Sequence, residues 1–98
     1  MNNSDDPVRR EREEAWIGDA VLALFARRWI LENDGSMDSE VFAAMTSNQF
    51  LSTVGQPTAI EAKIGRMFIK GGLEPADKLI TEELMPLFLK QRRNRSRK

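Results

Sequence analysis

Residues 15–26, AWIGDAVLALFA, constrain the fold most, because they are almost wholly apolar and carry one charged side chain, Asp19. Their composition is typical of helix. An unpartnered carboxylate on a packed apolar surface costs several kcal/mol, so we expect Asp19 to be neutralised, paired or bound to a cation. Gly18 disfavours helix by about 1 kcal/mol relative to alanine, and such a glycine usually marks the close approach of a second backbone or a ligand. Gly18 and Asp19 are therefore predicted to lie at the functional centre.

Helical patterns fill the rest of the chain, and no segment alternates between apolar and polar residues as a strand would. The first helix has an expected cap at Asp6 and a proline, Pro7, at its first position. Glycine and proline breaks separate the later stretches. The sequence therefore predicts an all-α fold. About five helices are expected: one from residue 7 to a stop signal at residues 33–35, then others over roughly 38–45, 47–54 and 58–70, and a last one from residue 74 onward with a kink at Pro86.

The C-terminal half of the first helix is apolar on nearly every side, which is wider than the stripe of an ordinary surface helix. We therefore expect a central helix, buried against its own chain and against a second subunit. Its apolar residues are Trp16, Ile17, Val21, Leu22, Leu24, Phe25, Trp29 and Ile30.

The composition excludes several catalytic classes. The 98 residues suffice for one domain and include no cysteine and no histidine. Thiol nucleophiles, structural zinc sites and histidine-dependent hydrolase triads are therefore excluded. Any catalysis would use carboxylates, hydroxyls, amines or a metal. The polar N-terminus and the absence of a long uncharged apolar run predict a cytoplasmic protein with no membrane partner.

Charge is distributed unevenly along the chain. Residues 90–98, KQRRNRSRK, hold six of the fifteen basic residues and no acidic one, so residues 1–89 carry a net charge of −6. We therefore divide the chain into a helical domain at 1–89 and a basic C-terminal tail at 90–98. Such a tail is typical of contact with phosphates, although a disordered, solubilising end has the same composition.

A second acid, Glu61, lies four residues before another helical glycine, Gly65. Two glycines in two helices allow the helices to cross closely, which would bring Asp19 and Glu61 together. Magnesium binds through oxygen ligands, typically one or two carboxylates plus waters and substrate phosphates. The two acids are therefore candidate ligands of a divalent cation that would assist phosphoryl chemistry.

Each acid also has a structural explanation. The spacing from Thr58 to Glu61 fits a capping box, in which the two side chains cap the start of the helix. Asp19 could form an ion pair with Lys63 or Arg66 from a packed helix. The sequence leaves these alternatives open.

Two segments, EAWIGDAVLALFARRWIL and TAIEAKIGRMFIKGGLEPADKLI, resemble the signature helix and the second active-site helix of the ribonuclease III family. TSNQFL, between them, is similar to the family's Ser-Asn segment, so the resemblance covers roughly residues 14–89. It implies a helical homodimer that cleaves double-stranded RNA with Mg²⁺ or Mn²⁺, with the signature helix at the dimer interface. Asp19 and Glu61 match the family's catalytic, metal-binding acids, and Asn48 matches a residue at the edge of the active site.

Two further acids of the full-length enzymes are absent. Ala15 stands where the signature usually has glutamate, and Thr58 stands where the second helix usually has aspartate. The carboxylate pattern is closest to that of mini-ribonuclease III, which resembles this chain at both positions. For Asn48, a solvated side chain after a Ser47 cap is the alternative.

The sequence thus predicts a metal-dependent endoribonuclease that hydrolyses phosphodiester bonds in double-stranded or structured RNA, such as an rRNA precursor. The alternatives are a catalytically inactive ribonuclease III-like RNA-binding protein and a plain helical interaction module. Basic side chains would contact the RNA through its phosphates and shape. They are Arg27, Arg28, Arg92, Arg93, Arg95 and Arg97.

Overall fold

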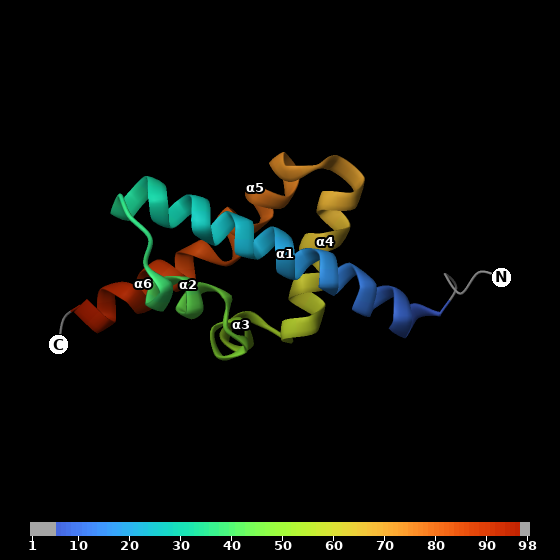
Figure 1. Cartoon of the computed structure of the whole chain (residues 1–98). Coiled ribbons are helices and arrows are strands. Elements are labelled where there is room, and N and C mark those ends of the chain that lie inside the picture. Colours follow the sequence, from blue (N-terminus) through green and yellow to red (C-terminus); the bar gives the residue numbers. More distant parts are fainter. Residues whose placement is uncertain (1–5, 97–98) are drawn as a thin grey trace.

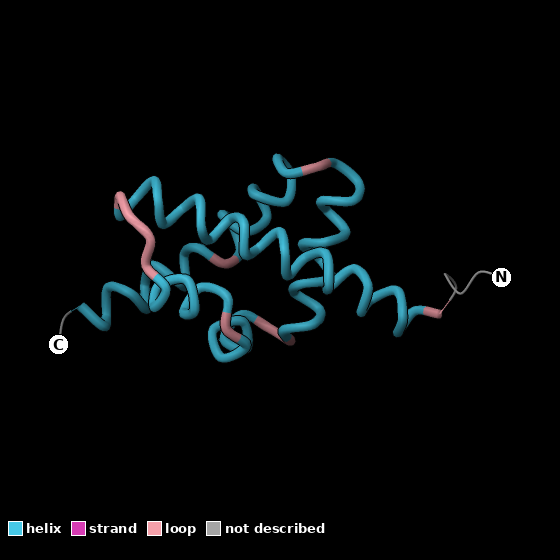
Figure 2. The backbone as a smooth tube through the Cα atoms, in the orientation of Figure 1, coloured by secondary structure: helices cyan, strands magenta, loops and turns pink. Residues whose placement is uncertain are grey.

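The computed structural model describes residues 6–96, and every element in that part of the chain is a helix. The predicted all-α fold is therefore confirmed. The molecule is elongated, with principal extents of 54 × 23 × 21 Å. A long helix runs along the body, and short loops connect the helices that follow it (Figures 1 and 2). The helices are α1 (Pro7–Asp34), α2 (Ser39–Thr46), α3 (Asn48–Val54), α4 (Pro57–Gly71), α5 (Leu73–Glu83) and α6 (Met85–Ser96).

Both ends of α1 follow from local sequence. The Asp6 carboxylate accepts hydrogen bonds from the backbone N–H groups of Val8 (3.0 Å) and Arg9 (3.3 Å), and Pro7 occupies the first turn. Gly35 ends the helix with φ 81°, a left-handed conformation that costs a glycine no steric strain. The bounds predicted for the first helix are therefore confirmed.

Small residues allow α1 and α4 to cross in close contact. A Cβ atom on Gly18 would overlap the backbone carbonyl oxygen of Glu61, and a Cβ atom on Gly65 would overlap that of Glu14. Ala15 is also buried at this crossing. The close crossing expected from the two glycines is confirmed (Figure 1).

The core lies where α1 meets the other helices. Its fully buried large side chains come from α1, α3, α4 and α5: Leu22, Leu51, Ile64 and Ile80. Phe88 of α6 joins this core, because its ring packs edge-on against Trp29 (5.9 Å between centroids) and Phe50 (5.7 Å). These contacts fix α6 to the body.

The C-terminal part differs from expectation. The last predicted helix is broken at Leu84 into α5 and α6, so the described residues form six helices. Pro86 does not kink a helix interior, because it falls in the first turn of α6, where a missing N–H costs nothing. Residues 90–96 continue α6, so the expected boundary at 89/90 falls inside a helix.

The burial of α1 also differs from expectation on one side of the helix. α1 is the central helix, as predicted, but the expected burial around its whole circumference is not found in this single chain. The side chain of Trp16 is 78% exposed and that of Leu24 is 42% exposed.

Replacing Gly18 with alanine should lower the free energy of unfolding, because the added Cβ forces α1 and α4 apart. Overpacking of this kind costs about 1–3 kcal/mol, whereas helix propensity alone would make alanine about 1 kcal/mol more favourable. Gly55→Ala is the control, since a Cβ there meets only the Ile60 side chain at 3.4 Å. Urea denaturation followed by circular dichroism measures both; a stabilised Gly18→Ala protein would contradict the crossing.

Candidate active site

Asp19 and Glu61 lie against each other at the crossing of α1 and α4. The backbone contact between Gly18 and Glu61 places the two acids in neighbouring positions on the two helices. A hydrogen bond joins their carboxyl groups, which requires one of the two to be protonated. The structure therefore brings together the two acids that the sequence singled out.

This arrangement raises the pKa of Glu61 from its ordinary 4.5 to about 7. Partial burial of the side chain is the largest cause, because it penalises the charged form. The negative charge of Asp19 and the hydrogen bond to Asp19 add to the effect. Protonated Glu61 donates that bond, and near neutral pH a nearby cation would displace the proton.

The capping-box alternative for Glu61 is wrong. The cap of α4 is Gln56, whose side-chain oxygen accepts a hydrogen bond from the Ala59 N–H at 2.6 Å. Pro57 follows as the first helical residue, so the helix begins two residues earlier than the capping box requires. The Glu61 side chain is thus not used as a cap and faces Asp19 instead.

The ion-pair alternative for Asp19 is also wrong. Arg66 donates to the Glu14 carboxylate at 3.0 Å, and Lys63 donates to the Glu83 carboxylate at 3.1 Å. Both cations that could have neutralised Asp19 therefore have other partners. Glu14 itself gave no signal in the sequence, because only the crossing brings it to Arg66.

The acid pair suits a hard divalent cation with few protein ligands. Within residues 6–96 there is no group of three or more His, Cys, Asp or Glu side chains that could hold a metal. The two positions where the full-length enzymes usually have further acids hold Ala15, which is buried, and Thr58, which is half-buried. Neither can supply a carboxylate ligand. Magnesium can bind through two carboxylates when waters and substrate phosphates complete its shell.

An open groove of about 570 Å³ adjoins Asp19 and is otherwise lined by apolar side chains. We call these side chains the apolar face. They are Trp16, Ile17, Ala20, Val21, Leu24, Phe68 and Leu73, from α1, α4 and α5. Most of this face comes from α1.

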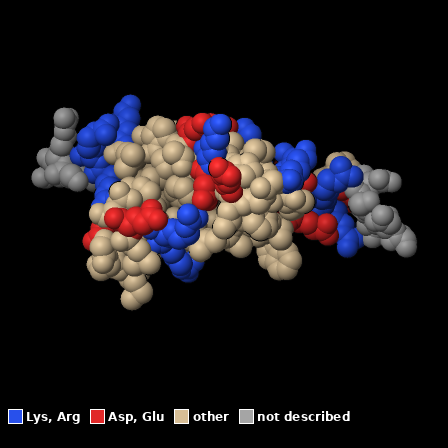
Figure 3. All heavy atoms as spheres, turned by 90° about the horizontal axis from the view of Figure 1, so that it is seen from above, with Lys and Arg blue, Asp and Glu red and all other residues tan. Residues whose placement is uncertain are grey.

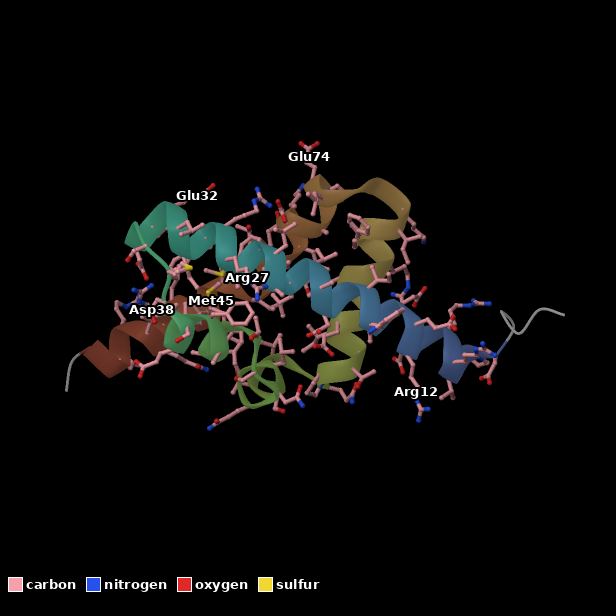
Figure 4. All side chains as sticks on the ribbon, viewed as in Figure 1. Arg12, Arg27, Glu32, Asp38, Met45 and Glu74 are labelled. Carbon is pink, nitrogen blue, oxygen red and sulfur yellow. The ribbon has the colours of Figure 1, made fainter. Side chains whose placement is uncertain are left out.

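Two of the candidate RNA contacts lie on α1 beyond the groove. The Arg27 guanidinium lies over the Phe42 ring, 4.3 Å from its centroid, and Arg27 (labelled in Figure 4) is an exposed residue. Arg28 donates to Asp77 at 2.9 Å, and this hydrogen bond, together with the negative charge of Asp77, raises the pKa of Arg28. Arg27 is therefore more available to a phosphate than Arg28.

The other candidates lie at the C-terminal end. Arg92 donates to both carboxylate oxygens of Asp34 (3.0 and 3.1 Å) and packs over Trp29, so it helps to hold α6 against α1. Arg93 is exposed on α6. Arg95 lies in the last turn of α6, and Arg97 lies outside the described residues.

Asn48 is exposed at the first position of α3. Ser47 caps this helix by accepting a hydrogen bond from the Phe50 N–H at 3.0 Å. This geometry agrees with the alternative of a solvated Asn48 after a serine cap.

Comparisons with family models, with curated proteins and with solved structures find no match for this chain. Among the described helices, none is both long and apolar enough to cross a membrane.

Replacing Glu61 with glutamine should raise the free energy of unfolding above pH 7 when a chelator is present. Because folding raises the pKa of Glu61 to about 7, the folded state holds this proton more tightly than the unfolded state. The stabilisation is complete below about pH 4.5 and is lost as the pH rises through about 7. The Glu61→Gln protein should keep about 1 kcal/mol more stability at pH 8, a value reduced for partial exposure.

Urea denaturation at pH 4 and pH 8 measures this difference. Glu82→Gln, on the exposed side of α5, is the matched control and should follow the wild type. An identical pH dependence in wild type and Glu61→Gln would contradict the acid pair.

Proposed function

We propose that this chain is a metal-dependent endoribonuclease with a ribonuclease III-like fold, which hydrolyses phosphodiester bonds in double-stranded or structured RNA such as an rRNA precursor. The observation that carries the proposal is the contact between Asp19 and Glu61. Two carboxylates on different helices are held together with no ion-pair partner among residues 6–96. An arrangement that is unfavourable without a cation is typical of a functional site.

Asp19 and Glu61 would hold Mg²⁺ or Mn²⁺. Their helices cross with backbone contact at Gly18 and Gly65, so the backbones that carry the two carboxylates are fixed relative to each other before any ligand binds. A bound cation of this kind supplies an activated water and neutralises charge on a phosphate under attack. Ionised Glu61 also needs a positive charge beside it, because Asp19 and partial burial both disfavour its charged form.

The resemblance to ribonuclease III supports the same two residues independently. Asp19 and Glu61 are the acids that the signature segments assign to catalysis, and mini-ribonuclease III has a similar reduced set. Arg27 and Arg93 are the candidate phosphate contacts whose side chains have no acidic partner among the described residues.

We also propose that two copies of the chain associate through the apolar face. Trp16 is 78% exposed, and Leu24 and Leu73 are 42% and 39% exposed, on one continuous surface. Large exposed apolar patches mark interaction sites. The resemblance assigns the dimer interface to the same helix.

The second candidate function is RNA binding without cleavage. It is favoured by Ala15, which is buried and stands where the signature of the active enzymes usually has glutamate. Half of the usual carboxylate set is therefore absent.

Asp19→Asn should abolish cleavage of a structured rRNA precursor in Mg²⁺ or Mn²⁺, because it removes a cation ligand while keeping the size of the side chain. Loss of a ligand should cost at least the roughly 100-fold seen when outer-shell partners of a metal are removed. Gel analysis of the RNA with each metal and with a chelator measures the effect.

Glu82→Gln is the control and should cleave like the wild type. Cleavage by the wild type in the presence of chelator would contradict the proposal, and so would cleavage by the Asp19→Asn protein. RNA binding without cleavage in the wild type, with either metal, would leave the second candidate function.

Trp16→Glu should convert the protein to a monomer, because it places a charge in the centre of the proposed interface, where burial would be costly. Sedimentation velocity at several concentrations measures the mass. Met37→Glu is the matched control, since Met37 is 88% exposed but lies outside the apolar face. A wild type that sediments as a monomer at all concentrations would contradict the dimer.

A further inference from the structure

A second groove, of about 500 Å³, lies between α3 and the C-terminal half of α6, and the proposed function does not use it. Among the side chains that the structure describes, its polar lining contains no charged one. The polar residues are Ser47, Gln49, Thr53, Gln91 and Asn94. The groove therefore offers neutral hydrogen-bonding groups rather than a charge.

Three of these groups are fixed by contacts within the protein. Ser47 caps α3. Thr53 donates to the Phe50 carbonyl oxygen at 2.6 Å and accepts a hydrogen bond from the Gln91 amide at 3.3 Å. The bond to Thr53 uses one amide hydrogen of Gln91 and orients its side chain in the groove wall.

Gln49 and Asn94 are exposed, and their side chains make no hydrogen bond within the described part of the chain. Each amide can donate two hydrogen bonds and accept others. Two unused amides from different helices thus share one groove with the oriented amide of Gln91.

Positive charge adjoins these amides. Lys90 lies one helical turn before Asn94 on α6, and Arg93 lies three residues after Lys90. Both side chains are exposed, and neither has an acidic partner among residues 6–96. Figure 3 shows Lys and Arg side chains gathered at the end of the molecule beside the C-terminus.

We propose that this groove binds an unpaired nucleotide of the RNA. Gln49, Gln91 and Asn94 hydrogen-bond the edge of the base, because amide side chains match the mixed donors and acceptors of nucleobases. Lys90 contacts a flanking phosphate. The base has to be unpaired, since only a nucleotide outside a duplex exposes all of its hydrogen-bonding edge.

This inference rests on the proposed function, because it takes RNA as the ligand. It narrows the substrate to a structured RNA with a single-stranded nucleotide near its duplex. The amide groove and the acid pair are separate sites, so they can be tested separately.

The test measures binding of fluorescent RNA by anisotropy, with chelator present so that no RNA is cleaved. The probes are a blunt-ended RNA hairpin and the same hairpin with a short single-stranded extension. The variants of the full chain are the double variant Gln49→Ala/Asn94→Ala, Lys90→Gln, and Thr81→Ala as an exposed control on α5. Circular dichroism checks that each variant keeps the helical content of the wild type.

The double variant should lose about fivefold or more in affinity for the extended hairpin, and its salt dependence should be unchanged, because it removes base contacts. Its affinity for the blunt hairpin should stay at the wild-type value. Lys90→Gln should weaken binding of the extended hairpin and reduce the slope against salt by about one counterion.

Equal affinity of wild type and double variant for the extended hairpin would overturn the inference, as would an equal loss for both probes. Failure of the proposed function has a separate readout in the cleavage assay, where the wild type would not cleave RNA in Mg²⁺ or Mn²⁺. A double variant that loses the extended hairpin but still cleaves at saturating RNA would support both proposals.

Discussion

The close approach of α1 and α4 at Gly18 and Gly65 is the contact on which the rest of this structure depends. Each glycine lies where a Cβ atom would overlap a carbonyl oxygen of the other helix, so no other residue allows the same distance between the helix axes. Because the helices meet at their backbones, the exposed Asp19 and the half-buried Glu61 are close enough to share a hydrogen bond. The same crossing aligns Glu14 with Arg66 on the opposite side of the contact.

Much of this centre could be predicted from the sequence, since its signals are local. Asp19 stands alone in an apolar helix, and Glu61 precedes a helical glycine at a spacing that puts both on one face. The caps at Asp6 and Gly35 likewise depend on a few neighbouring residues. The predicted start of α4 is wrong because two residues, Gln56 and Thr58, can cap the helix. Pro57 favours the Gln56 cap, since a proline is well suited to the first helical position.

Contacts between distant segments could not be predicted. Arg28 and Asp77 are 49 positions apart, and Arg92 and Asp34 are 58 positions apart. The hydrophobic periodicity of the separate segments does not predict these two ion pairs, because they form only where α5 and α6 pack beside α1. For the same reason the sequence predicts a separate basic tail. In the structure, Phe88 packs against Trp29, and Arg92 contacts both Trp29 and Asp34, so α6 is held against α1. The amide groove depends on this packing as well, because Gln91 and Asn94 reach Gln49 only after α6 has docked.

The distribution of charge bears on the choice between a nuclease and an inactive RNA-binding protein. Basic side chains lie at both ends of a molecule 54 Å long, and Arg12 points away from the body near one of them (Figures 3 and 4). The acid pair lies at the crossing of α1 and α4 (Figure 1). Adjacent carboxylates repel the phosphates of a bound RNA. A protein that only binds RNA gains nothing from two adjacent carboxylates there, whereas a protein that holds a cation between them gains both attraction for the phosphate and the means to hydrolyse it.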